Sequence, residues 1–444
     1  MFEEVIEENN KEERKRRIRR GIFVAVSAVS ATIIILSIIL IILWRVTYVE
    51  LSEVTEIPII YLDHSSRVTV DRTADYLGHP DLVLNDRGEL ITMYPEGHGK
   101  GNVIMRRSSD MGKNWSAKEI TPESWKESKE TPTIYSIKLH SGEEKLVMIS
   151  GCPAWKEGEQ DGFNFSYSDD GGYNWSEFTN WFGKEWAEET GKEPYDCIVA
   201  MSSLTQVKKR GFYVNEWLGT FHDHEFNIYK SYLSFDIYGN MEWSEPELLL
   251  EQYNDICQDN YLCEPEIIRT QEKLVDGVKQ SELILLMRNN KHDASMACVS
   301  YDEGKTWTEP AYLPNALSGD RHKAQYDPVT GKWLVTFRQV LGIKPNILST
   351  SKLYGVGWVA WVGDEDVLLS LAQGDWTKGC GDAYIVLAEN YGGSLDCGYA
   401  GTAADEDGNF VLVSYGRFSK STVNPYIMSV SFNLKELLEN NLMG

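Results

Sequence analysis

The stretch Ser300–Trp307, SYDEGKTW, occurs with small changes at two earlier places in the chain. SSDMGKNW spans Ser108–Trp115 and SDDGGYNW spans Ser168–Trp175, so all three share the pattern S-x-D-x-G-x-x-W. Their first serines lie 60 and then 132 residues apart, and half of 132 leads to Ser234. There SFDIYGNMEW carries the same four residue types in the same order with two extra residues. The spacings of 60, 66 and 66 residues indicate a repeated structural unit.

This period predicts a propeller. A unit of about 60 residues is too long for a helical hairpin repeat and fits a four-stranded blade. From Leu51 to Gly444 there are 394 residues, and division by about 64 residues per unit gives close to six blades. Six segments also read as a strand, a turn or loop, and a second strand. They begin at His79, Thr131, Cys197, Glu264, Arg321 and Gly398. The predicted fold class is all-β, a six-bladed β-propeller.

The octets themselves are typical of turns. Ser and Asp side chains two residues apart accept hydrogen bonds from the backbone N–H groups of a tight turn, and Gly adopts a positive φ there. The Trp is expected to return along the next strand and pack inward. This chemistry assigns the octet to the scaffold and not to catalysis.

The first 50 residues do not belong to this repeat. Gly21–Trp44 is an uncharged run of 24 residues, long enough to cross about 30 Å of hydrocarbon as a helix. A cleaved signal peptide and a buried core helix are the alternatives, but this run is longer than a signal peptide's apolar region of about 7 to 15 residues. Seven basic residues precede the run within residues 11–20 and only Arg45 follows it closely, which predicts a cytoplasmic N-terminus and an extracytoplasmic C-terminal domain.

The expected organisation is a cytoplasmic tail (1–20), a transmembrane anchor (21–44), a stalk with a first strand (45–74) and the propeller (75–444). The net charge of −24 disfavours nucleic-acid binding because the chain repels phosphate backbones and offers no basic stripe. It does not exclude an anionic ligand, since arginines can set the potential inside one pocket. Seven cysteines in an oxidising compartment permit disulfides, and Cys257 and Cys263 are near enough in sequence to pair.

The octets resemble the Asp-box of the sialidase superfamily, and the residues around them resemble a divergent branch of sialidase-like proteins from about Asp75 to Tyr415. In that family the box lies between the outer strands of a blade, on the side away from the active site. The resemblance therefore implies a sialidase-like propeller whose site lies at the opposite end of the blades, where the inner strands begin.

The resemblance also implies roles for individual residues. CEPEII, with Glu264, and DCGY, with Tyr399, are similar to the segments that carry the base and the nucleophilic tyrosine. A phenol with a pKa near 10 needs a neighbouring base in order to attack. Arg288 in LMRN resembles the second arginine of a triad that grips the substrate carboxylate, a task that suits a planar guanidinium. Arg321 in GDRH resembles the third arginine, and Arg338 in TFRQ is the alternative.

Two segments depart from the family pattern. Where sialidases open the first blade with Arg-Ile-Pro, this chain reads GHPD, so Gly78 takes the arginine position and His79 lies beside it. The loop expected to hold a general-acid aspartate reads PEGHGKG and offers Glu96 and His98, either of which could protonate a leaving group. His79 is expected to hold a hydroxyl or carboxylate, and Asp81 to share its strand face.

Together these features predict a membrane-anchored exo-glycosidase of the sialidase type that acts on terminal sialic acid or a related acidic sugar of a glycoconjugate. The alternatives are a glycosidase of the same fold with another terminal sugar, and a carbohydrate-binding propeller without catalysis. No cofactor is implied. His222 and His224 place only two ligand-type groups on one strand face, so no metal site is predicted.

Overall fold

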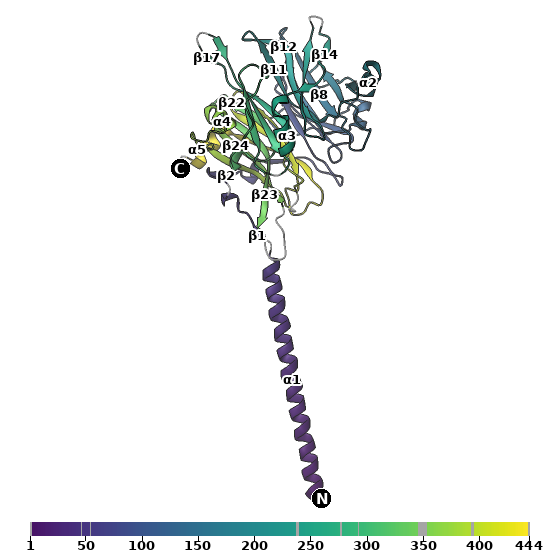
Figure 1. The fold of residues 1–444 in the computed structure, drawn as a ribbon, viewed down its shortest axis with the longest axis vertical. Coiled ribbons are helices and arrows are strands. Elements are labelled where there is room, and N and C mark those ends of the chain that lie inside the picture. The colour runs from purple at the N-terminus through teal and green to yellow at the C-terminus, as the bar shows by residue number, and fades with distance from the viewer. Residues whose placement is uncertain are drawn as a thin grey trace. The chain divides into compact units, whose positions relative to one another are not determined.

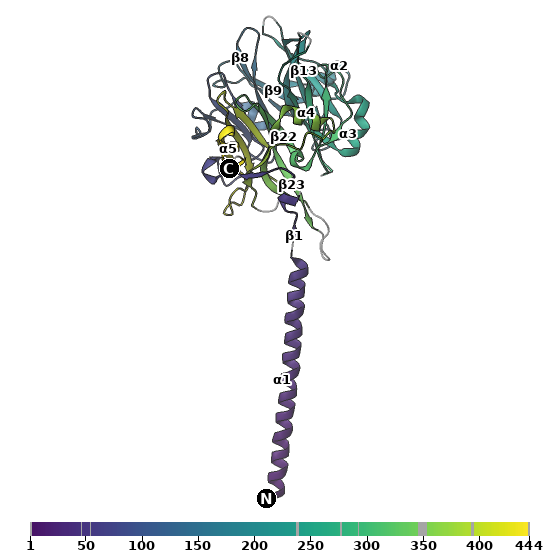
Figure 2. The same cartoon turned by 90° about the vertical axis from the view of Figure 1, so that its left-hand side faces the viewer.

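The computed structural model describes residues 2–45, 47–53, 55–236, 239–275, 278–291, 293–344, 353–391 and 395–442 (Figures 1 and 2). The chain divides into two units, one formed by Met1–Val49 with Gly342–Leu353 and one by Glu50–Leu341 with Tyr354–Gly444. The smaller unit contains helix α1 (Phe2–Trp44) and strand β1 (Thr47–Tyr48), which pairs with the end of β23 (Lys332–Lys344).

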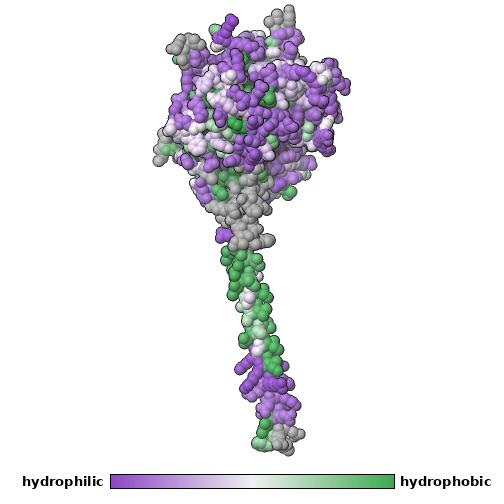
Figure 3. Space-filling view, in the orientation of Figure 1, coloured by the Kyte–Doolittle hydropathy of each residue, from purple (hydrophilic) through white to green (hydrophobic). Residues whose placement is uncertain are grey.

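Helix α1 is long and apolar enough, over Ile6–Leu43, to cross a membrane. Among the described residues it is the one helix that meets this criterion, and an N-terminal signal sequence meets it as well. The predicted span 21–44 lies inside this helix, and Figure 3 shows a largely apolar band along it. The direction in which the chain crosses a membrane stays a prediction.

The larger unit is a six-bladed β-propeller, as predicted. Strands β4, β7, β11, β16, β22 and β26 are the inner strands of successive blades, and each contacts the next until β26 returns to β4. Each inner strand pairs antiparallel with the following strand of its blade, at the six predicted hairpins. The first three blades are built from β4 (Asp81–Leu84), β5 (Leu90–Pro95) and β6 (Val103–Ser108); β7 (Pro132–Lys138), β8 (Glu144–Gly151), β9 (Phe163–Ser168) and β10 (Thr179–Trp181); and β11 (Ile198–Lys209), β12 (Phe212–His222), β13 (Ile228–Phe235), β14 (Met241–Trp243) and β15 (Glu247–Leu248).

The last three blades are built from β16 (Leu262–Arg269), β19 (Leu283–Asn289), β20 (Met296–Ser300) and β21 (Ala311–Tyr312); β22 (Asp320–Asp327), β23 (Lys332–Lys344), β24 (Leu353–Asp364) and β25 (Ala383–Glu389); and β26 (Ala400–Ala404), β27 (Asn409–Gly416) and β28 (Tyr426–Asn433). Two strands from the segment 45–74 complete the last two blades. β2 (Ile59–Tyr61) pairs parallel with β25, and β3 (Arg67–Asp71) pairs antiparallel with β28. The circle is thus closed by strands from both ends of the propeller sequence.

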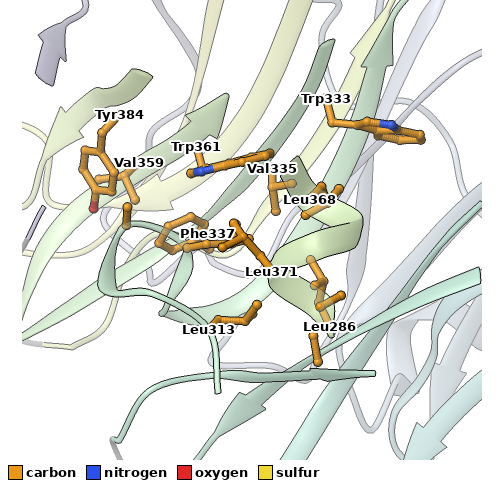
Figure 4. Close-up of a cluster of buried hydrophobic side chains, with 14 of the residues drawn as sticks. Leu286, Leu313, Trp333, Val335, Phe337, Val359, Trp361, Leu368, Leu371 and Tyr384 are labelled. Atoms are coloured by element: carbon orange, nitrogen blue, oxygen red, sulfur yellow. The ribbon is translucent and has the colours of Figure 1, made fainter. Parts of the chain in front are cut away.

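The remaining elements are short. They include the hairpin β17 (Lys273–Val275) and β18 (Val278–Gln280), and helices α2 (Lys184–Thr190), α3 (Asn254–Asn260), α4 (Glu365–Ala372) and α5 (Leu434–Leu442). Figure 4 shows the core between the fourth and fifth blades, where Leu368 and Leu371 of α4 pack beside Phe337 and Trp361. These four side chains are fully buried, and burying an apolar side chain of this size contributes about 1.5–3 kcal/mol.

All seven cysteines are free thiols, and six of them are buried. Cys257 lies in α3 and Cys263 in β16, and the disulfide that their closeness in sequence permits is not formed.

The repeated octets occupy the same place in successive blades. Ser108, Ser168 and Ser300 each end the third strand of a blade, and Ser234 lies one residue before the end of β13. In the second octet, Ser168 Oγ donates to Asp170 Oδ1 over 2.9 Å and accepts from Gly172 N over 2.9 Å. Trp307 packs with Leu218 and Ile228 of the preceding blade. Each octet is therefore a turn whose Trp joins neighbouring blades, in agreement with its assignment to the scaffold.

Candidate functional site

An unusual backbone conformation marks the starts of four inner strands. His79, Val199, Glu264 and Arg321 have φ values of 52°, 48°, 50° and 51°. This left-handed region costs a residue with a side chain about 1–2 kcal/mol. Register shifts accompany it in β11, β16 and β22. Strain of this kind persists where the surrounding structure demands it and is common at functional sites, which directs attention to this end of the blades.

Three predicted residues meet at this end. Tyr399 OH donates to Glu264 Oε1 over 2.7 Å, and Arg288 Nη1 lies 2.6 Å from Tyr399 OH and 3.0 Å from the same Glu264 oxygen. All three side chains are largely buried. The residues come from β16, β19 and the segment before β26, so two blades that are not neighbours in sequence supply one cluster.

The protonation states of this cluster suit a phenol paired with a base. Burial raises the pKa of Tyr399 well above its usual value, although Arg288 acts in the opposite direction. Burial also favours the neutral form of Glu264, but the guanidinium groups of Arg288 and Arg321 and the hydrogen bond from Tyr399 together outweigh it and hold the pKa of Glu264 below its usual value. At neutral pH the pair is therefore a neutral phenol that donates to a carboxylate, and the carboxylate can take the phenol proton when the oxygen attacks.

Arg321 differs from the other arginines of the site in its partners. It is 3% exposed, and its Nη1 has no hydrogen-bond partner among the described residues. Its guanidinium lies 5.8 Å from the centre of the Tyr399 ring. Glu264 Oε2 and His79 Nδ1 are also buried without a partner in the described part of the chain. Buried polar atoms are nearly always hydrogen-bonded, so unpartnered atoms gathered around Tyr399 are consistent with a ligand site.

Arg338, the alternative to Arg321, is hydrogen-bonded to neighbouring parts of the chain. Its Nε and Nη2 donate to Asp320 Oδ2 over 2.9 and 2.5 Å, and its Nη1 donates to the carbonyl oxygen of Leu395. The guanidinium lies 4.8 Å from the Tyr399 ring centre. Gly398 has a φ of 83°, and a Cβ there would lie 2.9 Å from Arg338 Cβ. Arg338 thus supports the segment that carries Tyr399.

The two histidines of the site lie together. The ring centres of His79 and His98 are 4.9 Å apart, and the His79 ring is 5.2 Å from Tyr399. His98 Nδ1 lies 2.7 Å from Tyr76 OH, and His79 Nε2 lies 3.1 Å from Tyr415 OH. Burial, followed by the nearby positive charges, lowers the pKa of His79 well below its usual value. His79 is therefore neutral.

Asp396 connects the two histidine contacts. Its Oδ1 accepts from Tyr76 OH over 2.5 Å and from Tyr415 OH over 3.1 Å, and lies 3.5 Å from His98 Nδ1. Sequence reasoning did not single out Asp396, Tyr76 or Tyr415. Asp396 does stand in the DCGY motif three residues before Tyr399, which was the available signal.

The structure also explains the departure at Gly78. A Cβ at this position would lie 2.7 Å from Tyr76 Cε1 and 3.1 Å from the Tyr415 ring. The two tyrosines therefore take the space next to Gly78 into which a side chain would extend. An arginine cannot be accommodated here without moving Tyr76 or Tyr415.

Two other predicted residues, Glu96 and Asp81, are held by an ion pair and by backbone N–H groups. Glu96 Oε1 pairs with Lys118 Nζ over 3.2 Å, and of the two candidates in the PEGHGKG loop only His98 lies against His79. Asp81 is buried, and its carboxylate accepts from the backbone N–H groups of Leu82 and Ile134 over 3.0 and 3.1 Å. Asp81 therefore joins the first two blades.

Glu130, at the start of the second blade, is likewise held by the backbone. Its two oxygens accept from Thr131 N over 2.9 Å and Val199 N over 2.7 Å, and burial raises its pKa. His222 Nδ1 accepts from the N–H of Glu264 over 3.4 Å, while His224 pairs with Asp196 over 2.5 Å. Within the described ranges, no group of three or more His, Cys, Asp or Glu residues is arranged to hold a metal ion.

Comparisons with solved structures give the fold a context. The chain is similar to a protein of unknown function from Dyadobacter fermentans, with a TM-score of 0.53, 15% identity and coverage of 82% of this chain and 97% of that one. It is similar to an alpha-L-arabinanase of Penicillium chrysogenum, with a TM-score of 0.50, 12% identity and coverage of 83% and 98%. The Hadza microbial sialidase Hz136 matches with a TM-score of 0.49, 17% identity and coverage of 81% and 66%.

No family model matches the chain, and no curated protein matches it in sequence. At these identities the similarity concerns the fold, which this chain shares with the Dyadobacter fermentans protein and the arabinanase.

Proposed function

We propose that the protein is an exo-glycosidase of the sialidase type that removes a terminal acidic sugar, such as sialic acid, from a glycoconjugate. The observation that carries the proposal is the buried Arg321, whose Nη1 has no partner among the described residues, beside the Tyr399–Glu264 pair. A carboxylate of the substrate would complete the hydrogen bonding of that guanidinium, and the phenol lies close enough to act on the same sugar.

The proposed reaction has two steps. In the first, Tyr399 Oη attacks the anomeric carbon, its proton passes to Glu264, and the leaving oxygen takes a proton from His98 as the glycosidic bond breaks. In the second, water attacks the same carbon and gives a proton to His98, while the tyrosine oxygen leaves and recovers its proton from Glu264. Arg288 stabilises the charge on Glu264 and Tyr399 throughout, because it contacts both.

The N-terminal part suggests where this activity operates. We infer that α1 anchors the enzyme in a membrane with its N-terminus in the cytoplasm, since basic residues cluster on that side of the apolar run. The propeller would then act on glycans outside the membrane.

A glycosidase specific for another terminal sugar is the second candidate, and the environment of Gly78 favours it. With the space next to Gly78 occupied by Tyr76 and Tyr415, the site lacks the arginine by which the resemblance would complete a carboxylate grip. A substrate with a weaker or differently placed negative charge would suit the remaining groups.

The test is a panel of fluorogenic glycosides offered to the full chain in detergent, with Tyr399→Phe as the matched control. Release from a sialoside that disappears in the variant supports the proposal. Release only from neutral glycosides supports the second candidate, and binding of glycans without release would show a carbohydrate-binding propeller and overturn both.

A further inference from the structure

The Asp396 contacts determine where the protons of two histidines lie. A carboxylate only accepts hydrogen bonds, so Tyr76 and Tyr415, which both contact Asp396 Oδ1, must each donate their single hydroxyl proton to it. Each tyrosine oxygen is then left as an acceptor toward its histidine.

For His98 this fixes one ring nitrogen. Tyr76 OH lies 2.7 Å from His98 Nδ1, and because its proton points to Asp396, Nδ1 must carry the hydrogen of that contact. The ring is 70% exposed, so Nε2 is the nitrogen left to exchange a proton. Asp396 lies 3.5 Å from His98 Nδ1, and the neutral His79 packs against the His98 ring. The neighbours of His79 include Arg321 and Arg338.

In His79 the hydrogen lies on the other ring nitrogen, Nε2. Tyr415 OH lies 3.1 Å from His79 Nε2 and donates to Asp396, so Nε2 carries the hydrogen. In the neutral ring Nδ1 then bears a lone pair, and it is buried without a partner among the described residues. The other tautomer would bury an unsatisfied N–H group at a cost of about 1–3 kcal/mol.

We propose that Asp396 is a positioning residue that sets both histidines through two parallel contacts, Asp396–Tyr76–His98 and Asp396–Tyr415–His79. His98 is thereby held with Nε2 as its proton-exchanging atom, and His79 presents Nδ1 as a hydrogen-bond acceptor. The catalytic part of this inference rests on the proposed function, in which the Nε2 proton of His98 passes to the leaving oxygen and Nδ1–H stays on Tyr76.

This arrangement also specifies the substrate group near His79. A neutral ring with a bare Nδ1 does not bind a carboxylate, but it accepts a hydrogen bond from a hydroxyl or an amide N–H. The first blade would thus recognise a donor group of the sugar, while the carboxylate is left to the arginine side of the site. Without an arginine at position 78, this part of the site would bind a hydrogen-bond donor of the sugar instead of its carboxylate.

The direct test is a nitrogen-15 spectrum of histidine-labelled full chain in lipid vesicles, because protonated and bare imidazole nitrogens have well-separated shifts. His79→Gln and His98→Gln assign the two rings. The wild type should show Nε2–H for His79 and, at alkaline pH, Nδ1–H for His98. Asp396→Asn should leave mixed tautomers in both rings, Tyr76→Phe should change only His98, and Tyr415→Phe only His79. Rings that keep the same tautomer in all three variants would overturn the proposal.

The catalytic part is tested by comparing leaving groups. An alkyl-linked sialoside needs a proton at its leaving oxygen, whereas an aryl sialoside with an acidic phenol needs little help. Asp396→Asn is expected to lower kcat about 100-fold on the alkyl substrate and far less on the aryl one. Asp407→Asn, in the exposed turn between β26 and β27, should alter neither.

Equal losses on both substrates would reduce Asp396 to a structural role. If the wild type cleaves no sialoside at all, the proposed function fails, and the nitrogen spectra still decide whether Asp396 sets the two rings. Should Asp396→Asn fail to fold, Tyr76→Phe alone must reproduce the difference between alkyl and aryl substrates.

Discussion

The two ends of the propeller blades each bury an arginine, but with different partners. At the octet end Arg107 is 8% exposed and donates to Glu89, Glu119 and the carbonyl oxygens of Gly171 and Gly172. At the other end Arg321 is 3% exposed and has an unpartnered Nη1 among the described residues. An arginine therefore stabilises the fold at one end, whereas at the other end an arginine has an Nη1 to which a ligand can bind.

Replacing each arginine by methionine should separate these two uses. Arg321→Met is expected to raise KM for an acidic substrate about 100-fold, since losing one partner of a buried charged contact costs about 2–5 kcal/mol of binding. Arg107→Met should leave KM unchanged and lower the free energy of unfolding by about 3 kcal/mol, because carboxylates and carbonyls lose their partner.

Enzyme kinetics and urea denaturation of the two variants measure both effects. The assignment of a structural role to Arg107 and a binding role to Arg321 would be wrong if Arg107→Met raises KM, or if Arg321→Met destabilises the protein as much as Arg107→Met does.

Gly78→Ala probes how tightly the site end is packed. The added Cβ would meet Tyr76 at 2.7 Å and Tyr415 at 3.1 Å, and such overpacking costs about 1–3 kcal/mol. Gly142→Ala, where a Cβ meets nothing within 4 Å, is the matched substitution. Urea denaturation should show a loss for Gly78→Ala beyond that of Gly142→Ala, where the φ of 86° brings its own strain. A smaller loss would mean that the two tyrosines move aside easily.

The octets can be compared with their degenerate copy. Ser168 Oγ is bonded to both Asp170 and the N–H of Gly172, whereas Ser234 Oγ makes a 3.4 Å bond to the carbonyl of Glu242. Ser168→Ala is expected to cost about 1–2 kcal/mol, because a buried N–H loses its acceptor. Ser234→Ala should cost less than about 0.5 kcal/mol. Equal losses in urea denaturation would show that the degenerate turn works as the intact ones do.

The smallest expected effect concerns pH. Burial alone would raise the pKa of Asp170, but hydrogen bonds from Asn174, Ser168 and Tyr173 lower it to about 2. The folded-state pKa thus lies below the unfolded value of about 3.9. The stabilisation is present above about pH 4 and is lost as the pH falls toward 2. Asp170→Asn should therefore lower Tm at pH 7 more than at pH 2.5, and an equal decrease at both pH values would contradict this account.

The sequence predicted the scaffold well because its signals are local. The S-x-D-x-G-x-x-W turns form within eight residues, so their spacing alone indicates the blades. The Tyr399–Glu264–Arg288 cluster was also proposed from segments with a recognisable resemblance, and the structure brings these three side chains into contact.

The Asp396 contacts could not be predicted in this way. Tyr76 and Asp396 are 320 residues apart, and His79 and Tyr415 are 336 apart. Only the closure of the ring between the first and last blades brings them together. The partners of Arg338 likewise depend on how neighbouring segments fold, which is why the sequence left Arg338 as an alternative to Arg321.

In the proposed reaction Tyr399 attacks the anomeric carbon of an acidic sugar. A sialyl fluoride with a second fluorine beside the anomeric carbon reacts with such a nucleophile and leaves an intermediate that water removes slowly. Mass spectrometry of the digested full chain should find the sugar on the peptide that contains Tyr399, and no adduct in Tyr399→Phe. An adduct on a different residue, or none in a protein that still hydrolyses sialosides, would contradict the account.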